Sequence, residues 1–326
     1  MPLKRFKSSA RFVLVFFIVT LTTLLSSCGH YIRSEHLWQS ALSQDHSLVG
    51  DIIRTSDYRR VQPNDLISQI STADYVLIGE KHDNPDHHHI QNWILTHLLP
   101  KEKYRLVFEM MDYSQQDQLD KLNSNSLEED ILKATKLDKS GWEKQHYLPL
   151  IQTGLAKGAD IVGGNVPKED LMSIYQEGFS SIEAKDRFST LEAIEAPIQE
   201  LIKEEIYQQH CKMIPIKKTT PMVNIQIAKD ASMSFAMSQD SKNKSVLIAG
   251  NYHVNKDVGV PKHLTQSQPE KTSLVIQILE VSDEYDTLKS LQNGNFHGAD
   301  YLWFTPRWTD KDYCEDMKAQ MHKSSQ

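Results

Sequence analysis

Cysteine is scarce in this chain of 326 residues, which contains only three, all far apart. No two of them have the close spacing of a zinc-binding cluster or of a Cys-x-x-Cys-His attachment motif, so neither kind of site is expected. Cys211 and Cys314 could pair in an oxidising compartment, but the sequence leaves their pairing open and slightly favours two unpaired thiols. After residue 25 no apolar run approaches the roughly 20 residues that a membrane-spanning helix requires.

Positive charge is also in short supply. The chain has 36 basic and 43 acidic residues, a formal net charge of −7. Lys4, Arg5, Lys7 and Arg11 all lie at the N-terminus, so the remainder is more acidic still. Proteins that bind nucleic acid need concentrated Lys and Arg against the phosphates. Nucleic acid is therefore not expected as a partner.

The N-terminus has the features of an exported lipoprotein. Its basic residues precede an apolar segment, residues 12–25, which is too short to span a membrane but fits a signal peptide. A Leu-Ser-Ser-Cys sequence ending at Cys28 resembles a lipobox. We expect residues 1–27 to be a lipoprotein signal peptide and Cys28 to carry the lipid, with palmitate-type acyl chains, at the start of a tether over residues 28–50. Gly29 after the cysteine implies anchoring to the outer membrane, with the periplasmic face as the default.

From residue 51 onward, runs of β-branched and aliphatic residues alternate with segments of helical pattern. Continuous apolar runs of this length suit strands that are buried on both faces. The alternation predicts an α/β domain over residues 51–326, with a mostly parallel central sheet flanked by helices. Residues 180–221 are charged and broken by prolines, which predicts a helical insertion. The predicted strands are 75–78, 104–108, 159–162, 245–249 and 273–279, and the predicted helices are 87–99, 114–122, 143–156 and 225–238.

Polar side chains follow several predicted strands at the point where each strand ends. A Gly-Glu-Lys-His sequence at residues 79–82 follows the first strand, Glu109 follows the second, and a Gly-Asn-Tyr-His sequence at residues 250–253 follows the fourth. The carboxyl ends of parallel strands meet at one edge of a sheet, where open α/β folds bind ligands. The two Gly-x-x-His turns should bring His82 and His253 together with Glu80 and Glu109. Folding alone does not require this doubled pattern, so we predict a functional site at this edge.

The four side chains permit more than one kind of chemistry. Glu80, His82, Glu109 and His253 are suitable ligands for a divalent metal, which would lower the pKa of a bound water and supply a nucleophile for hydrolysis. A metal-free hydrolase would use a histidine as general base. Each residue taken alone has a simpler explanation, because an acidic residue at a strand end often caps the following helix.

Most of the chain after Cys28 resembles the ChaN-type haem-binding lipoproteins, within the superfamily that includes Tiki proteases, TraB-like proteins and erythromycin esterases. The resemblance implies a lipid-anchored protein of haem and iron acquisition that binds haem without turnover, in a pocket at the strand edge or at the interface of a homodimer. It leaves an outer-membrane haem receptor open as a partner. The matching residues are the two Gly-x-x-His turns, His87-His88, Phe108-Glu109-Met110, Trp142, Tyr147-Leu148-Pro149-Leu150, Asp230-Ala231-Ser232-Met233, Ala299-Asp300-Tyr301 and Trp303-Phe304-Thr305-Pro306.

The resemblance also implies a tyrosine as axial ligand, with His and Lys near the propionates. Phenolate oxygen is a suitable ligand for ferric haem. Tyr147 is the first candidate and Tyr252 the second, although Tyr147 is flanked by leucines and could instead belong to the core. Lys81, His82 and His253 are assigned to the propionates by position alone. A Tiki-like protease or esterase that uses the two Gly-x-x-His turns is the less favoured alternative.

Overall fold

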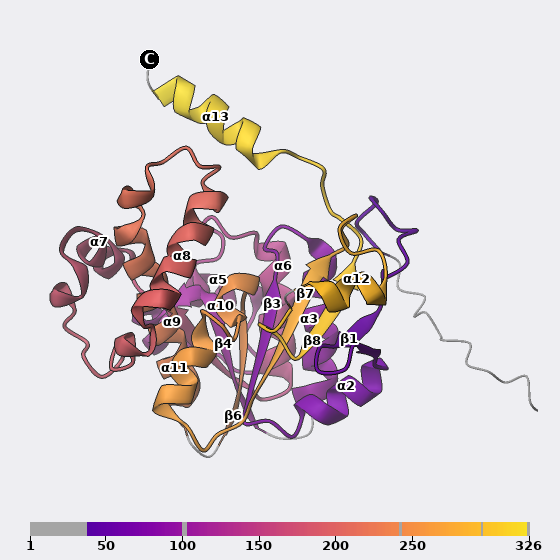
Figure 1. Ribbon diagram of the computed structural model, residues 1–326. Coiled ribbons are helices and arrows are strands. Elements are labelled where there is room, and N and C mark those ends of the chain that lie inside the picture. Colours follow the sequence, from indigo (N-terminus) through magenta and orange to yellow (C-terminus); the bar gives the residue numbers. More distant parts are fainter. Residues whose placement is uncertain (1–37, 100–102, 241–242, 295, 325–326) are drawn as a thin grey trace, which may run out of the picture. The chain divides into compact units, whose positions relative to one another are not determined.

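A computed structural model describes residues 38–99, 103–240, 243–294 and 296–324 of the chain (Figure 1). From Trp38 onward the described residues form one compact unit. The predicted signal peptide, Cys28 and the first part of the predicted tether lie outside these residues. Among the helices of the described ranges, none is both long enough and apolar enough to cross a membrane.

Eight strands form one sheet, in the order β2-β1-β8-β7-β3-β6-β4-β5. The neighbours from β8 to β5 run parallel, whereas β1 is antiparallel to both β8 and β2. The strands are β1 (Ile52–Arg54), β2 (Arg59–Arg60), β3 (Tyr75–Glu80), β4 (Tyr104–Asp112), β5 (Asp160–Asn165), β6 (Lys244–Gly250), β7 (Ser273–Glu280) and β8 (Tyr301–Thr305).

Helices cover both faces of this sheet, and short 3-10 turns, labelled η, connect several of them (Figure 1). The longer helices are α2 (Pro63–Ile70), α3 (Pro85–Leu98), α5 (Glu128–Thr135), α6 (Lys144–Ala156), α7 (Lys168–Glu177), α8 (Ala196–Gln209), α9 (Thr220–Ser238), α11 (Val260–Ser267) and α13 (Tyr313–Ser324). The shorter elements are η2 (Tyr113–Gln115), α4 (Gln116–Leu119), η3 (Gly178–Ser181), η4 (Leu191–Ala193), η5 (Ile216–Lys218), α10 (Asn251–Val254) and α12 (Leu288–Asn293).

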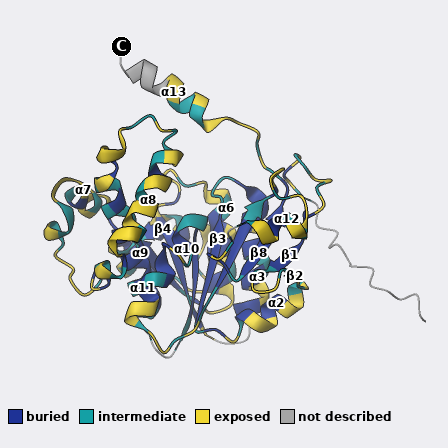
Figure 2. Ribbon diagram, viewed as in Figure 1, coloured by how far each residue is buried: buried dark blue, intermediate teal, exposed yellow. Residues whose placement is uncertain are grey.

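Both faces of the central strands are buried, which explains their continuous apolar sequences. Side chains alternate between the faces of a strand, so in β3 Val76 and Ile78 pack into one core cluster, and Tyr75 and Leu77 into the other. Figure 2 shows the strands in the colour of buried residues and the outer sides of the surrounding helices as exposed. The predicted α/β class and the mostly parallel sheet are confirmed.

The five predicted strands are all present, but three others were not predicted. β1 and β2 are three and two residues long, too short to show a periodic pattern. β8 is a fully buried strand that pairs with β7 and was not recognised as one. Residues 38–50 were expected in the tether, yet Leu48 and Val49 are buried in the core, so the compact unit begins before residue 51.

The predicted insertion at residues 180–221 contains one long helix, α8, between short 3-10 turns. α8 begins at Ala196, later than the charged pattern suggested, because Pro197 sits in its first turn, where the ring's fixed φ suits a helix start. Ile202 and Ile206 of α8 pack against Ile227 of α9, forming a small hydrophobic cluster separate from the two main ones.

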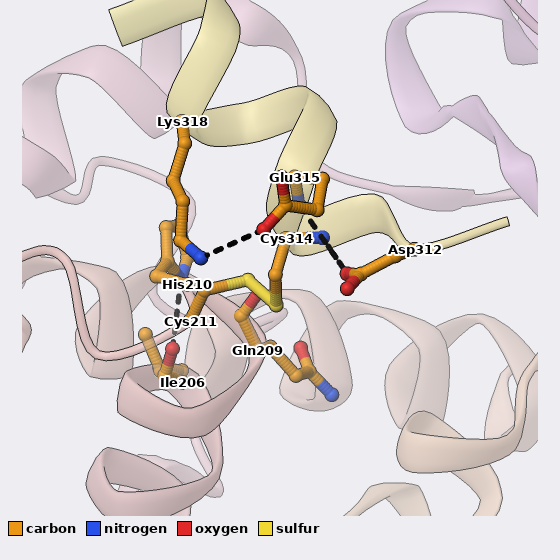
Figure 3. The surroundings of a disulfide bond; sticks show 8 residues. All are labelled: Ile206, Gln209, His210, Cys211, Asp312, Cys314, Glu315 and Lys318. Atoms are coloured by element: carbon orange, nitrogen blue, oxygen red, sulfur yellow. Dashed lines mark hydrogen bonds and ion pairs between the residues drawn. A yellow bond between two sulfur atoms is a disulfide. The ribbon is translucent and has the colours of Figure 1, made fainter.

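The expectation of two unpaired thiols was wrong, because Cys211 and Cys314 form a disulfide (Figure 3). Their sequence separation of 103 says nothing about their distance in space, and the fold brings their Cα atoms to 5.6 Å, within the usual range for such a bond. α8 ends at Gln209 and is followed by its C-cap residue His210 and then by Cys211. The disulfide joins Cys211 to Cys314 in the first turn of α13.

Candidate functional site

Parallel strands bring the four acid and histidine residues to one edge of the sheet. Glu80 is the last residue of β3. Glu109 lies in β4, where the pairing with β5 shifts register between Phe108 and Asp112. β6 leads directly into the short helix α10, which carries His253. The predicted grouping of these residues is therefore present in the structure.

The glycines of the two Gly-x-x-His turns are required by space. A Cβ atom on Gly250 would lie 3.0 Å from the Nε2 atom of His82, and one on Gly79 would lie 2.4 Å from the Oδ1 atom of Asn251. Glycine therefore lets each turn approach the other closely.

Glu80 is a buried carboxylate that faces three side chains. The Tyr147 hydroxyl donates to its Oε1 atom at 2.7 Å, the Nδ1 atom of His82 lies 2.8 Å from the same oxygen, and Nδ1 of His88 lies 3.0 Å from Oε2. Burial alone would raise the pKa of Glu80, but the two histidines outweigh it and hold that pKa far below its usual range. Burial and the charge of Glu80 together raise the pKa of Tyr147 strongly, which keeps its hydroxyl protonated.

Glu109 is the second buried carboxylate. Its Oε2 atom accepts the Gly250 backbone N–H at 2.9 Å, and its Oε1 atom lies 3.3 Å from Nε2 of His253 and 4.0 Å from Nζ of Lys229. Burial again opposes ionisation, yet His253, His82 and Lys229 bring the pKa of Glu109 far below its usual range. Glu109 is consequently a carboxylate at neutral pH.

His253 lies between two carboxylates. Its Nδ1 atom donates to Oδ1 of Asp230 at 2.6 Å, while Nε2 faces Glu109. Burial would lower the pKa of His253, but the charges of Glu109 and Asp230 prevail and raise it to about 10. The ring therefore stays an imidazolium at neutral pH. Acidic and histidine side chains contact one another alternately here, and we call this series the acid–histidine chain. Its members, in order of contact, are Asp230, His253, Glu109, His82 and Glu80.

His82 is the solvent-accessible end of this chain. Its side chain is 41% exposed, its Nε2 atom lies 3.9 Å from Oε2 of Glu109, and the edge of its ring meets Trp142 at a centroid distance of 4.9 Å. Burial alone would lower the pKa of His82, but the hydrogen bond to Glu80 and the charge of Glu109 raise it above the usual value.

A cleft of about 610 Å³ opens beside His82. Its walls include the apolar side chains of Trp142, Ile278 and Leu279, and it is also lined by Lys81, Lys229 and Tyr252. The Lys81 ammonium is paired with Glu280 at 3.0 Å and with Asp83 at 3.5 Å. For Lys229, the nearest carboxylate among the ion pairs of the described residues is Glu109 at 4.0 Å.

The two candidate tyrosines occupy different environments. Tyr147, on α6, is buried at 1% exposure, donates to Glu80 and is not among the residues that line the cleft. Tyr252, on α10, lines the cleft, and its buried hydroxyl has no hydrogen-bond partner among the described residues. Burial and the charge of Asp230 raise the pKa of Tyr252. The hydroxyl of Tyr252 is thus a buried polar group of a residue that lines the cleft.

The four residues that a metal-dependent hydrolase would use as ligands are not arranged around a metal site. Glu80, His82, Glu109 and His253 contact one another as acid–histidine pairs rather than surrounding a common point. Among the residues described by the structure, no group of three or more His, Cys, Asp or Glu side chains has the geometry to hold a metal ion.

Comparison with models of known protein families identifies the family of this chain. A family model described as haem-binding uptake, Tiki superfamily, ChaN matches residues 66–264, more than half of the sequence. The chain belongs to this ChaN family. The match includes every member of the acid–histidine chain, and it confirms the resemblance that was drawn from the Gly-x-x-His turns. Among curated proteins no significant match is found.

A solved structure of a ChaN protein shares the fold, and others match at lower scores. A ChaN protein of Campylobacter jejuni, described as binding haem cofacially, matches with a TM-score of 0.65 and 24% identity over 77% of this chain and 95% of its own. An erythromycin esterase matches at a TM-score of 0.47 and 11% identity, covering 77% of this chain and 95% of the esterase. A toxin effector domain from Vibrio vulnificus matches at 0.41 and 13%, covering 69% of this chain and 37% of that one.

Within this ChaN fold, three residues of the site were given no individual role from the sequence. Asp230 was noted only as part of a matching motif, and its contact with His253 depends on how α9 packs against the sheet. Lys229, its neighbour, lines the cleft. His88 belongs to the His87-His88-His89 run, and the start of α3 at Pro85 would have placed it one turn inside the helix, on the face toward β3.

Proposed function

We propose that this chain binds haem in the cleft at the carboxyl ends of β3, β4, β6 and β7. The observation that carries the proposal is the cleft's lining, which combines apolar side chains with Tyr252, whose hydroxyl has no hydrogen-bond partner among the described residues. The cleft's volume of about 610 Å³ lies within the range of small-molecule and cofactor sites, which combine such walls with a few placed polar groups. Membership of a haem-binding uptake family supports the same ligand.

Tyr252 is a better candidate for the axial ligand than Tyr147. A phenolate that binds ferric iron must lose its proton, and the charge of a bound cation offsets the burial that raises a tyrosine pKa. Tyr252 has a free hydroxyl beside the cleft, whereas the hydroxyl of Tyr147 is held by Glu80. We therefore reverse the order that the sequence suggested. Haem would supply a ferric centre, and this chain's residues would hold and orient it.

Lys229 and His82 are the cationic groups best placed for the propionates. Lys229 lines the cleft with only a long contact to Glu109, and His82 has a raised pKa and an exposed ring. Lys81 is less suitable because two carboxylates already hold it, and His253 is buried between carboxylates of its own.

A haemin titration of the full-length chain, followed by absorbance, tests the ligand and its coordination. We expect saturable, stoichiometric binding with a high-spin, tyrosinate-type spectrum. Tyr252→Phe should abolish that spectrum, and Tyr147→Phe should leave it intact. Non-saturating binding would contradict the proposal, and an unchanged spectrum in Tyr252→Phe would contradict the assignment of the ligand.

The oligomeric state of the chain follows from how haem would be held. The Campylobacter jejuni ChaN is described as binding haem cofacially, and a face-to-face arrangement here would need two copies of the chain. We propose a haem-linked homodimer, tested by light scattering with and without haemin.

We also propose a lipid anchor at Cys28 in the outer membrane, facing the periplasm, and an outer-membrane haem receptor as a donor. Cys28→Ser should move the protein from the membrane fraction to the soluble fraction.

A second candidate, hydrolysis, is favoured by one observation. The Nδ1 atom of His82 is held by Glu80 while its ring is exposed to the cleft, which is the arrangement of an oriented general base. The pairing of the site residues with one another supports a metal-free form over a metal-dependent one. A screen of ester and peptide substrates tests this, since His82→Asn should abolish any activity found. Stoichiometric metal in protein purified without chelator would instead favour the metal-dependent form.

A further inference from the structure

The segment that follows β8, residues 306–314, contacts residues at the rim of the cleft, and we call it the strap. The Trp308 backbone N–H donates to Oε1 of Glu280 at 2.9 Å, at the end of β7. Further along, the hydroxyl of Tyr313 donates to Asp83, and Nζ of Lys81 lies 5.8 Å from the centre of the Tyr313 ring. Glu280 and Lys81 both line the cleft. The strap is therefore attached to the β7 and β3 side of the cleft.

The far end of the strap is attached to the other side by a covalent bond. Cys314 forms the disulfide with Cys211, which lies two positions after Gln209, the last residue of α8 and a lining residue of the cleft. Figure 3 shows this bond between the end of α8 and the start of α13, with Gln209 beside it. The strap therefore links the lining residues Lys81 and Glu280 to the end of α8, where Gln209 lines the same cleft.

Apart from the disulfide and the contacts of Tyr313 with Asp83 and Lys81, the start of α13 is held mainly by contacts within its own segment. Asp312 caps the helix by accepting the backbone N–H of Cys314 at 2.8 Å, a contact within the segment itself. No residue of α13 with a described side chain belongs to a hydrophobic core cluster. The chain leaves α8 with Cys211 at φ +55° and Lys212 at φ +58°, a region that non-glycine residues populate sparsely. The disulfide thus fixes a turn that α8 has no intrinsic preference to keep.

We propose that the disulfide-closed strap is a redox-controlled gate on the cleft. A dithiol reductant attacks one sulfur and forms a mixed disulfide, and its second thiol then resolves that bond. The two electrons and two protons pass to Cys211 and Cys314, and the reductant becomes a disulfide. Release of α8 from α13 then widens the mouth and speeds the entry and exit of the ligand. The effect on haem rests on the haem-binding function proposed above, whereas the opening of the mouth does not.

The first test measures the gate without haem, on the full-length chain before and after treatment with dithiothreitol. Hydrogen exchange is followed in peptides covering residues 203–212 and 306–316, and the rate at which diethyl pyrocarbonate modifies His82 reports access to the cleft. We expect both to rise about tenfold on reduction, as for the loss of one tethering contact. Exchange in β3 and β6 should not change. Equal rates of His82 modification in the oxidised and reduced protein would overturn the proposal. Faster hydrogen exchange throughout the core strands would also overturn it, because the disulfide would then stabilise the whole fold and not only the strap.

The second test measures haem release in variants, because dithiothreitol also reduces ferric haem. Cys211→Ser and Cys314→Ser each remove the bond, and transfer of haem to an excess of apomyoglobin should be about tenfold faster from both than from the wild type. Glu315→Gln, which keeps the disulfide and removes only an exposed pair with Lys318 within α13, is the matched control and should transfer haem at close to the wild-type rate. Tight binding with identical transfer rates would refute the gate and leave the haem function standing. Absence of haem binding, together with faster His82 modification on reduction, would support the gate and refute the haem function.

Discussion

Replacing Glu109 with glutamine removes the charge at the centre of the acid–histidine chain while keeping the shape of the side chain. The amide oxygen can still accept the Gly250 N–H, but the amide group no longer attracts the His253 imidazolium 3.3 Å away. Loss of one partner from a buried ion pair costs about 3–5 kcal/mol. Asp230 still holds His253 at 2.6 Å, so we expect Glu109→Gln to lower the free energy of unfolding by about 2–3 kcal/mol.

The pH dependence gives this prediction its sharpest test. The folded state depresses the pKa of Glu109 below its ordinary value of 4.5, so the stability it contributes is present above that pH and is lost as the pH falls. In urea unfolding, the gap between wild type and Glu109→Gln should therefore narrow by about 1.4 kcal/mol for each pH unit below 4.5. Glu200→Gln, which removes an exposed pair with Lys203, should show little change at any pH. A gap of constant size from neutral to acid pH would refute the assignment of a buried, ionised Glu109.

Three further changes probe neighbouring parts of the site. Tyr147→Phe removes the donor to Glu80 and should destabilise the fold by about 1.5–3 kcal/mol in urea unfolding; stability equal to wild type would contradict the contact. Because the pKa of His253 is raised from 6.5 to about 10, its stabilising effect is complete below 6.5, and the melting temperature should fall as the pH rises from there toward 10; an unchanged melting temperature would show that the ring is neutral. Gly259→Ala places a Cβ 2.2 Å from the backbone oxygen of His253 and should shift α10, seen as weaker haemin binding, whereas wild-type affinity would show that the backbone adjusts.

The sequence was sufficient to predict the sheet edge because both signals involved are local. A run such as Tyr75 to Ile78 is long and apolar enough to mark a buried strand, and the turn residues follow it directly. The grouping of Glu80 with His82 needs only the rule that parallel strands end together. These features survive in a single sequence without any knowledge of how distant segments pack.

Contacts between distant segments could not be predicted in this way. Whether Tyr147 faces the cleft or Glu80 depends on how α6 packs against β3, and the periodicity of α6 identifies its buried side but not the polar group it meets there. Cys211 and Cys314 pair because α13 returns to the end of α8. α8 itself starts late because a single proline sets its first turn.

The arrangement of charge explains how an acidic protein can hold an anionic ligand. The net charge of the chain is −7, and four carboxylates, of Glu80, Glu109, Asp230 and Glu280, lie at the cleft or just beneath it. Two of them, Glu80 and Glu109, face histidines whose pKa values are raised, so their charge is compensated inside the protein. Glu280, which also lines the cleft, is paired with Lys81, and the cationic groups left without a close carboxylate of this kind are His82 at its exposed ring edge and Lys229. Local pairing, rather than net charge, therefore sets the potential that a haem propionate would meet.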